Sequence, residues 1–178
     1  MKLEPTIIID SREQRPLVFS LPTVVAGLDV GDYSVTGLEH RIGCERKSLP
    51  DLVACCGSER DRFVRELERL QGRRFRCVVC ECTLADIERG DWPSRIIPNV
   101  VLGSIASWSV RYGLPFFFCG DHAATARFTA RWLSMSARCI ALESEAASAF
   151  LSIAEGLGET SPLGAVESAG GLAATATA

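Results

Sequence analysis

Short apolar runs that alternate with amphipathic segments limit the folds open to this chain more than any other feature. The apolar runs of strand length, each of which predicts a buried strand, are TIIID (6–10), RFRCVVCE (74–81) and LPFFFCG (114–120). Two further strands are predicted at 24–35 and 40–47, around a glycine-containing hairpin connection at 36–39. Because segments of helical spacing separate these strands, the order of elements predicts an α/β fold with a mixed central sheet flanked by helices.

Capping residues and helical spacing predict where the helices lie. Ser48, followed by Pro50 and Asp51, predicts the start of a short helix that runs through Cys56. Further helices are predicted after the caps Ser58, Asn99 and Asp121, over TLADIERG (83–90) and over 144–156.

The length and composition indicate the domain organisation. The chain has 178 residues, 47% of them hydrophobic, which is enough apolar material for one domain with a core of its own, expected at 1–156. Residues 157–178 are rich in Ala and Gly and contain almost no large apolar side chain. Burial there cannot offset the entropy of ordering, so this segment is predicted to be a disordered tail.

Charge and hydropathy exclude two classes of protein. Residues 1–139 carry 19 basic and 17 acidic residues, and the remainder carries five acidic residues and no basic one. This balance is well short of that of a chain held on DNA by charge alone, so a nucleic-acid role must depend on local patches and a site. No apolar run approaches membrane-helix length and no cleavable signal pattern is present, which predicts a cytoplasmic protein without a membrane partner.

The eight cysteines are interpreted as reduced thiols. The one spacing that resembles a metal site, Cys77-x-x-Cys80-x-Cys82, lacks the second ligand pair that structural zinc requires. Packing within a strand is the preferred interpretation, because buried free cysteines behave as small apolar side chains.

The segment CERKSLPD carries the residues best suited to chemistry. Glu45 and Lys47 lie two apart on a predicted strand and therefore share a face, whereas Arg46 points to the other face. If the neighbouring strand brings Asp32 alongside, two carboxylates and an ammonium meet, and hard oxygen ligands of this kind suit Mg²⁺ or Mn²⁺. An isolated E-x-K pattern is more often a solvated edge strand, but Lys47 is one of only two lysines in an arginine-rich chain.

The spacing of these residues resembles the XPF-type structure-specific endonucleases. The family pattern G-D, spacer, E-R-K-x-x-x-D is matched by Gly31-Asp32, by Glu45-Arg46-Lys47 and by Asp51, and the family's upstream D-x-R-E is matched by residues 10–13. The resemblance covers about residues 6–135 and implies a restriction-endonuclease-like fold. It also implies a metal-dependent DNA endonuclease that acts at branched or flap structures in repair, recombination or replication.

The resemblance implies a role for each motif residue. Asp32 and Glu45 are expected to be metal ligands assisted by Asp10, and Lys47 to orient or activate the attacking water. Arg12 and Arg46 are expected to bind phosphate or to structure the site. Asp51 occupies the last motif position, but a Ser48-x-x-Asp51 capping box explains it equally well, so both interpretations stay open.

The sequence departs from the family after residue 135, where the signature of a helix-hairpin-helix module is not found. The expected partners are branched DNA and either a second copy of the chain or a subunit that carries such a module. The arginines between 60 and 76 are interleaved with acids and are interpreted mostly as a salt-bridged solvent face. Two alternatives remain: a catalytically silent nuclease-like subunit that supports an active partner, and a binding module that never cuts.

Overall fold

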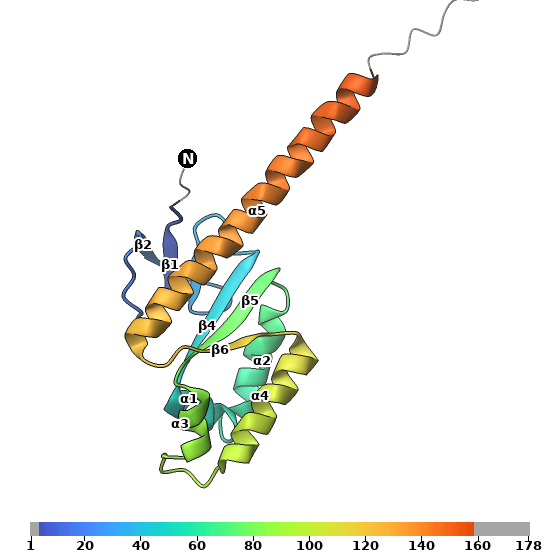
Figure 1. Ribbon diagram of the computed structural model, residues 1–178. Coiled ribbons are helices and arrows are strands. Elements are labelled where there is room, and N and C mark those ends of the chain that lie inside the picture. Colours follow the sequence, from blue (N-terminus) through green and yellow to red (C-terminus); the bar gives the residue numbers. More distant parts are fainter. Residues whose placement is uncertain (1–3, 159–178) are drawn as a thin grey trace, which may run out of the picture. The chain divides into compact units, whose positions relative to one another are not determined.

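A six-stranded mixed sheet runs through the part of the chain that the computed structural model describes, residues 4–158 (Figure 1). The strands are β1 (Ile7–Asp10), β2 (Thr23–Ala26), β3 (Tyr33–Val35), β4 (Ile42–Ser48), β5 (Phe75–Glu81) and β6 (Phe116–Phe118). Their order across the sheet is β2-β1-β3-β4-β5-β6. β1 pairs with β2 in parallel and with β3 antiparallel, and β3 pairs antiparallel with β4. β4, β5 and β6 are parallel.

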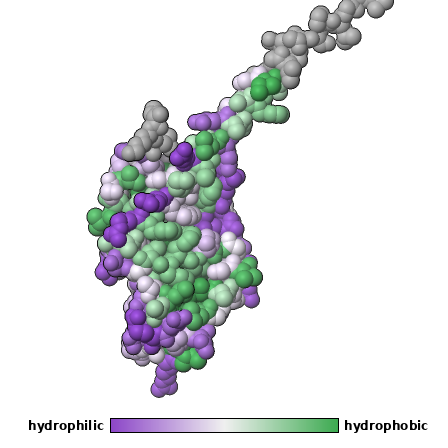
Figure 2. Space-filling view, viewed as in Figure 1, coloured by the Kyte–Doolittle hydropathy of each residue, from purple (hydrophilic) through white to green (hydrophobic). Residues whose placement is uncertain are grey.

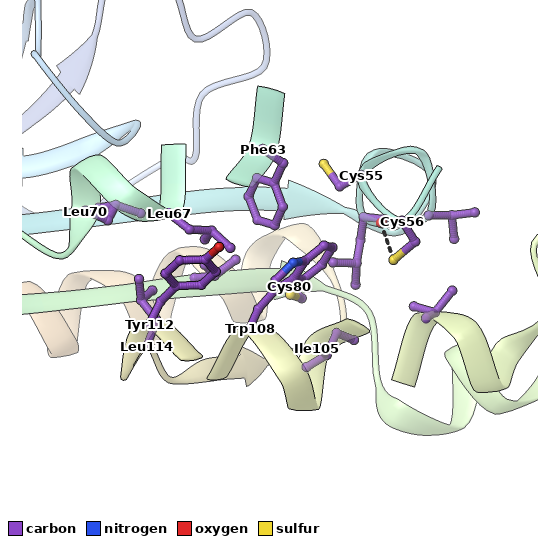
Figure 3. Close-up of a cluster of buried hydrophobic side chains, with 14 of the residues drawn as sticks. Cys55, Cys56, Phe63, Leu67, Leu70, Cys80, Ile105, Trp108, Tyr112 and Leu114 are labelled. Carbon is purple, nitrogen blue, oxygen red and sulfur yellow. Dashed lines mark hydrogen bonds between the residues drawn. The ribbon is translucent and has the colours of Figure 1, made fainter. Parts of the chain in front are cut away.

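Helices cover both faces of this sheet, which confirms the expected α/β class. The helices are α1 (Leu49–Cys55), α2 (Arg60–Leu70), α3 (Leu84–Arg89), α4 (Pro98–Tyr112) and α5 (His122–Gly158). The core cluster on one face joins side chains of α1 to α4, and Figure 3 shows Phe63 of α2 against Trp108 of α4, with ring centroids 5.1 Å apart. The cluster on the other face includes Leu133 and Ala137 of α5.

Strand β5 lies between the two core clusters, and the cysteines within it and just after it are divided between them. Cys77 packs in the cluster with α5, whereas Cys80 and Cys82 pack in the cluster with α1 to α4. All three are buried free thiols. Because successive residues of a strand point to opposite faces, Cys77 and Cys80 cannot bind one metal ion, and the interpretation as strand packing is confirmed.

Three boundaries differ from the sequence-based predictions. The single strand predicted at 24–35 is wrong: β2 and β3 are separate, with Gly31 at φ +78° between them, and β2 pairs with β1. Asn99 does not cap α4, because Pro98 takes the first turn and Ile97 is the cap. Ser58 does not cap α2, whose cap is Glu59 without a side-chain hydrogen bond.

The C-terminal prediction of two helical stretches is also wrong, because α5 runs without a break from His122 to Gly158. The sequence between these ends contains no Gly or Pro before Gly156 that would stop a helix. The chain divides into two units, one through Ala141 and one from Leu142. The tail predicted at 157–178 lies, from residue 159 onward, outside the described residues. Among the described helices, none has both the length and the apolar content needed to cross a bilayer.

Candidate active site

Strand β4 presents an acidic and a basic side chain to the same face of the sheet. Glu45 and Lys47 are both buried, and the Lys47 ammonium forms an ion pair with the Glu45 carboxylate. The ammonium also lies 4.9 Å from the centroid of the Phe63 ring on α2. The sequence-based expectation that Glu45 and Lys47 share a face is therefore confirmed.

Asp32 reaches this pair through a tight turn at the end of the β2–β3 connection. Gly31 adopts φ +78°, and a Cβ at this position would lie 3.0 Å from the Cys44 carbonyl oxygen, so the turn requires glycine. The Asp32 N–H donates to that same carbonyl at 2.8 Å. The Asp32 Oδ2 in turn accepts a hydrogen bond from the Arg46 backbone N–H at 2.7 Å. Asp32 is thus held between the backbones on either side of Glu45.

The charges of these carboxylates are only partly compensated. Burial, and then the negative charge of Glu45, raise the pKa of Asp32 well above its ordinary value. Burial also raises the pKa of Glu45, although the Lys47 ammonium acts in the opposite direction. Burial opposes the charged form of Lys47 too, but Glu45 and then Glu66 raise its pKa above the ordinary value, so the ammonium stays protonated.

Asp10 lies at the end of β1 and has its carboxylate engaged by the protein itself. Its Oδ1 accepts from the backbone N–H and the Nε of Arg12, both at 2.8 Å, and its Oδ2 accepts from the Leu28 N–H at 2.7 Å and from the Arg12 Nη2 at 3.0 Å. The hydrogen bond from the Arg12 side chain lowers the pKa of Asp10 to about 2. Asp10 borders the same pocket as Asp32 and Glu45, but serving as a metal ligand would require it to give up one of these hydrogen bonds.

The two motif arginines have different environments. The Arg12 side chain is 71% exposed, although its guanidinium is tied to Asp10. Arg46 is buried, and its guanidinium contacts Glu81 at 2.8 Å and Glu13 at 3.3 Å. The Glu81 carboxylate also meets the Nδ1 of His122 at 2.5 Å. The Arg46 guanidinium is therefore held by two carboxylates, whereas the Arg12 side chain is largely exposed.

Ser48 caps α1 as predicted, but the reciprocal bond of a capping box, from the Ser48 backbone N–H to the Asp51 carboxylate, is not formed. The Ser48 hydroxyl donates to the Asp51 carboxylate at 2.6 Å and accepts from the Asp51 N–H at 3.3 Å, at the start of α1. Asp51 also borders the larger of two adjoining pockets, of about 410 Å³, together with Asp32 and Lys47. Capping accounts for its geometry, and its place at the pocket is compatible with a second role.

Helix α2 forms a wall of the site that the sequence interpretation assigned to solvent. The smaller pocket, of about 280 Å³, is bordered by residues at i, i+4 and i+7 of this helix, namely Arg62, Glu66 and Arg69. The expected salt bridges exist, since Arg62 contacts Glu59 at 2.8 Å and Glu66 at 3.9 Å. Glu66 nevertheless turns inward, with 18% of its side chain exposed, and its Oε2 lies 3.5 Å from the Lys47 ammonium. The sequence signal that could have identified this wall is the helical spacing of these three polar residues, which places them on one face of α2.

The residues present fit a hard divalent cation. Asp32 and Glu45 offer carboxylate oxygens whose negative charges are not fully compensated, which favours a positive ion beside them. Within residues 4–158, no three His, Cys, Asp or Glu side chains come together as a complete cation site.

Comparison with known proteins identifies the family. Residues 9–132 match the sequence model of the ERCC4 domain. The chain belongs to the ERCC4 domain family. No curated protein matches this ERCC4 domain chain in sequence.

The fold of this ERCC4 domain is that of the XPF nucleases, as the sequence resemblance predicts. XPF from Aeropyrum pernix is similar with a TM-score of 0.60 and 20% identity, over 79% of this chain and 69% of the XPF chain. XPF from Aeropyrum pernix in complex with DNA is similar with a TM-score of 0.59 and 20% identity, over 75% and 66% of the two chains. At this identity the likeness establishes the fold alone, a mixed six-stranded sheet with flanking helices.

Proposed function

We propose that this ERCC4 domain is a metal-dependent endonuclease that hydrolyses DNA phosphodiester bonds with Mg²⁺ or Mn²⁺. The observation that carries the proposal is the convergence of Asp32, Glu45 and Lys47 on one pocket. Two carboxylates with incompletely compensated charge beside a fixed ammonium form the arrangement that metal-assisted phosphodiester hydrolysis needs.

Each residue of the pocket has a proposed part. Asp32 and Glu45 would hold the cation, which when bound polarises the phosphodiester and lowers the pKa of a bound water. Lys47 places a compact positive charge where it orients the attacking water or the scissile phosphate. Arg12 and Arg62, with side chains 71% and 61% exposed, are placed to contact neighbouring phosphates.

The proposed substrate is branched or flap DNA, handled in repair, recombination or replication in the cytoplasm. XPF from Aeropyrum pernix has been captured with DNA, and the shared fold supports a DNA substrate here. The two adjoining pockets share Arg12, Asp32, Lys47 and Arg62. Arginines at the rim and carboxylates at the floor are suited to a polyanion whose phosphate approaches a cation.

The proposed assembly is a homodimer or a heterodimer with a subunit that carries a helix-hairpin-helix module. Figure 2 shows a broad apolar area over β6 and the adjoining parts of α4 and α5. The three phenylalanines of β6, an edge strand of the sheet, are only half-buried. An exposed apolar area of this kind favours a protein interface, and a second subunit would extend a small DNA-binding surface.

Cleavage assays on defined DNA structures test the proposal. The purified protein would be incubated with end-labelled flaps, forks, four-way junctions and linear duplex, in Mg²⁺, in Mn²⁺ and in EDTA. We expect metal-dependent cleavage of the branched substrates and little cleavage of the linear duplex. Glu45→Gln serves as the inactive comparison, and Glu88→Gln, an exposed glutamate of α3, serves as the control for loss of an acidic charge.

The same assay separates the alternatives. Binding of branched DNA without cleavage in either metal would favour a catalytically silent subunit, and the assay would then be repeated with candidate partners. Equal binding with and without metal, again without cleavage, would favour a module that only binds DNA. Cleavage that persists in Glu45→Gln would contradict the proposed site.

A further inference from the structure

Glu66 contacts the catalytic lysine from a different element of the fold. Lys47 lies on β4 and Glu66 on α2, 19 residues further along the chain, and the Lys47 ammonium lies 3.5 Å from the Glu66 Oε2. Both side chains are largely removed from solvent, with 10% and 18% exposed. Charges that are shielded from water interact more strongly than surface pairs, so this contact has more effect than an exposed salt bridge.

Glu66 has two charged neighbours, Arg62 on its own helix and Lys47 on β4, and each offers a reason for a carboxylate at this position. Arg62 lies one helical turn away, with its Nη1 3.9 Å from the Glu66 Oε1, and an ion pair at this spacing is ordinary on a helix surface. The Lys47 contact is shorter and more buried, and it joins two elements of the pocket. Arg62 is 61% exposed, so solvent and salt screen its pairing with Glu66 more than they screen the pairing of Lys47.

Lys47 depends on few neighbours for its position. Within residues 4–158, the carboxylates that pair with its ammonium are those of Glu45 and Glu66, and the Phe63 ring lies beneath it at 4.9 Å. Glu45 has a second task, because it is proposed to hold the cation. A carboxylate that serves a divalent cation has less charge to offer an ammonium, so in the working site Glu45 alone is a poor anchor for Lys47.

We propose that Glu66 is the positioning residue for Lys47, and that it holds the ammonium in the pocket while Glu45 serves the cation. The proposal rests on the proposed nuclease function. It assigns to α2 a part in the reaction and not only in binding. Glu66 does not touch the scissile phosphate in this assignment; it acts through Lys47.

The composition of the chain permits a test of the Lys47 environment that does not depend on cleavage. Lys2 and Lys47 are the only lysines, so acylation of each amine is resolved by peptide mass spectrometry, with Lys2 as the internal reference in every variant. A lysine that loses a buried carboxylate partner is freer to leave its position and reach an acylating reagent, which speeds its acylation. Glu66→Gln keeps the shape of the side chain and removes its charge.

The matched control is Glu68→Gln, which removes a charge from an exposed position on the same helix. We expect Lys47 to be acylated several-fold faster, relative to Lys2, in Glu66→Gln than in the wild-type protein. In Glu68→Gln the relative acylation rate of Lys47 should equal the wild-type rate. In the cleavage assay, Glu66→Gln should lower kcat about 10-fold to 100-fold, the scale seen when a supporting residue is lost, with little change in KM. Thermal melting of both variants should stay close to the wild-type value.

The outcomes separate this inference from the nuclease proposal. Faster acylation of Lys47 in Glu66→Gln together with a kcat-specific loss would support the inference. If Glu66→Gln and Glu68→Gln have equal acylation rates and equal kcat, Glu66 does not position Lys47 and the inference is overturned. If no protein cuts DNA but Lys47 acylation still rises in Glu66→Gln alone, the contact is upheld and the nuclease proposal fails.

Discussion

The carboxylate of Asp32 accepts a hydrogen bond from the backbone N–H of Arg46, 2.7 Å away, so a residue before β3 is fixed directly to the E-R-K segment of β4. Both halves of the motif are therefore held together by main chain, and the Arg46 side chain is left to bind Glu13 and Glu81.

Asp32→Asn should abolish cleavage without unfolding the protein. The amide oxygen can still accept from the Arg46 N–H, but the negative charge that would hold a cation is gone. Because the pKa of Asp32 is raised in the fold, its charged form opposes folding near neutral pH, and Asn should melt at the same or a higher temperature in EDTA. Mg²⁺ should raise the melting temperature of the wild-type protein and not that of Asp32→Asn. Asp91→Asn, an exposed substitution, is the control; cleavage in Asp32→Asn would remove Asp32 from the site.

Lys47→Arg should lose most of the cleavage rate although the positive charge is kept. The guanidinium is broad and planar, and it replaces a compact ammonium in a buried position between Glu45 and Glu66. We expect kcat to fall on the order of 10²-fold, the scale for displacing a positioned catalytic group. DNA binding, measured by fluorescence anisotropy in Ca²⁺, should survive because the carboxylates are unchanged. A rate near that of the wild-type protein would mean that Lys47 supplies only a generic positive charge.

Gly31→Ala should damage the site more than Gly37→Ala. Both glycines have φ near +79°, so both substitutions strain the backbone by about 1 kcal/mol. A Cβ at position 31 would also lie 3.0 Å from the Cys44 carbonyl oxygen, whereas a Cβ at position 37 meets nothing within 4 Å. Urea unfolding should show a larger decrease in the free energy of unfolding for Gly31→Ala than for Gly37→Ala. Only Gly31→Ala should lose cleavage, because it displaces Asp32. Equal losses would show that strain alone matters at both positions.

Asp10→Asn should destabilise the fold at neutral pH, with an effect that fades in acid. The pKa of Asp10 is lowered to about 2 from 3.8, so its charged form favours the folded state by about 2 kcal/mol above pH 4. This contribution is lost as the pH falls from about 4 through 2. The free energy of unfolding, measured in urea with EDTA, should therefore differ most between wild type and Asp10→Asn at pH 7, and the difference should shrink as the pH falls towards 2. A constant difference across this range would show that shape, not charge, explains the effect.

The sequence was most informative where one residue type has one physical reason to be present. The shared face of Glu45 and Lys47 and the cap that Ser48 forms at the start of α1 follow from local rules, and the structure has both. The motif spacing also led to the family and its fold. The sequence predicts one strand where the structure has β2 and β3, because the apolar pattern gives no sign of the left-handed turn at Gly31.

The part of the site that the sequence did not identify depends on contacts between distant elements. Alternating charges on α2 indicated a solvent face, and Glu66 was grouped with them, because its partner Lys47 lies on another strand. The sequence does not predict the surroundings of Arg46 either. Its partner Glu81 lies at the end of β5, and Glu81 in turn contacts His122 at the start of α5. Pairings of this kind are set by the packing of the sheet and have no local signature.

Strand β4 is buried along almost its whole length, between β3 and β5 and beneath helices on both faces. The proposed catalytic residues of β4 thus belong to the buried core, and substitutions there disturb packing as well as the proposed chemistry. The opposite wall is an amphipathic helix whose Arg62 and Arg69 can change without opening the interior. Variants meant to change the proposed DNA binding would therefore alter Arg62 and Arg69 of α2 and leave β4 and the inward-facing residues of α2 untouched.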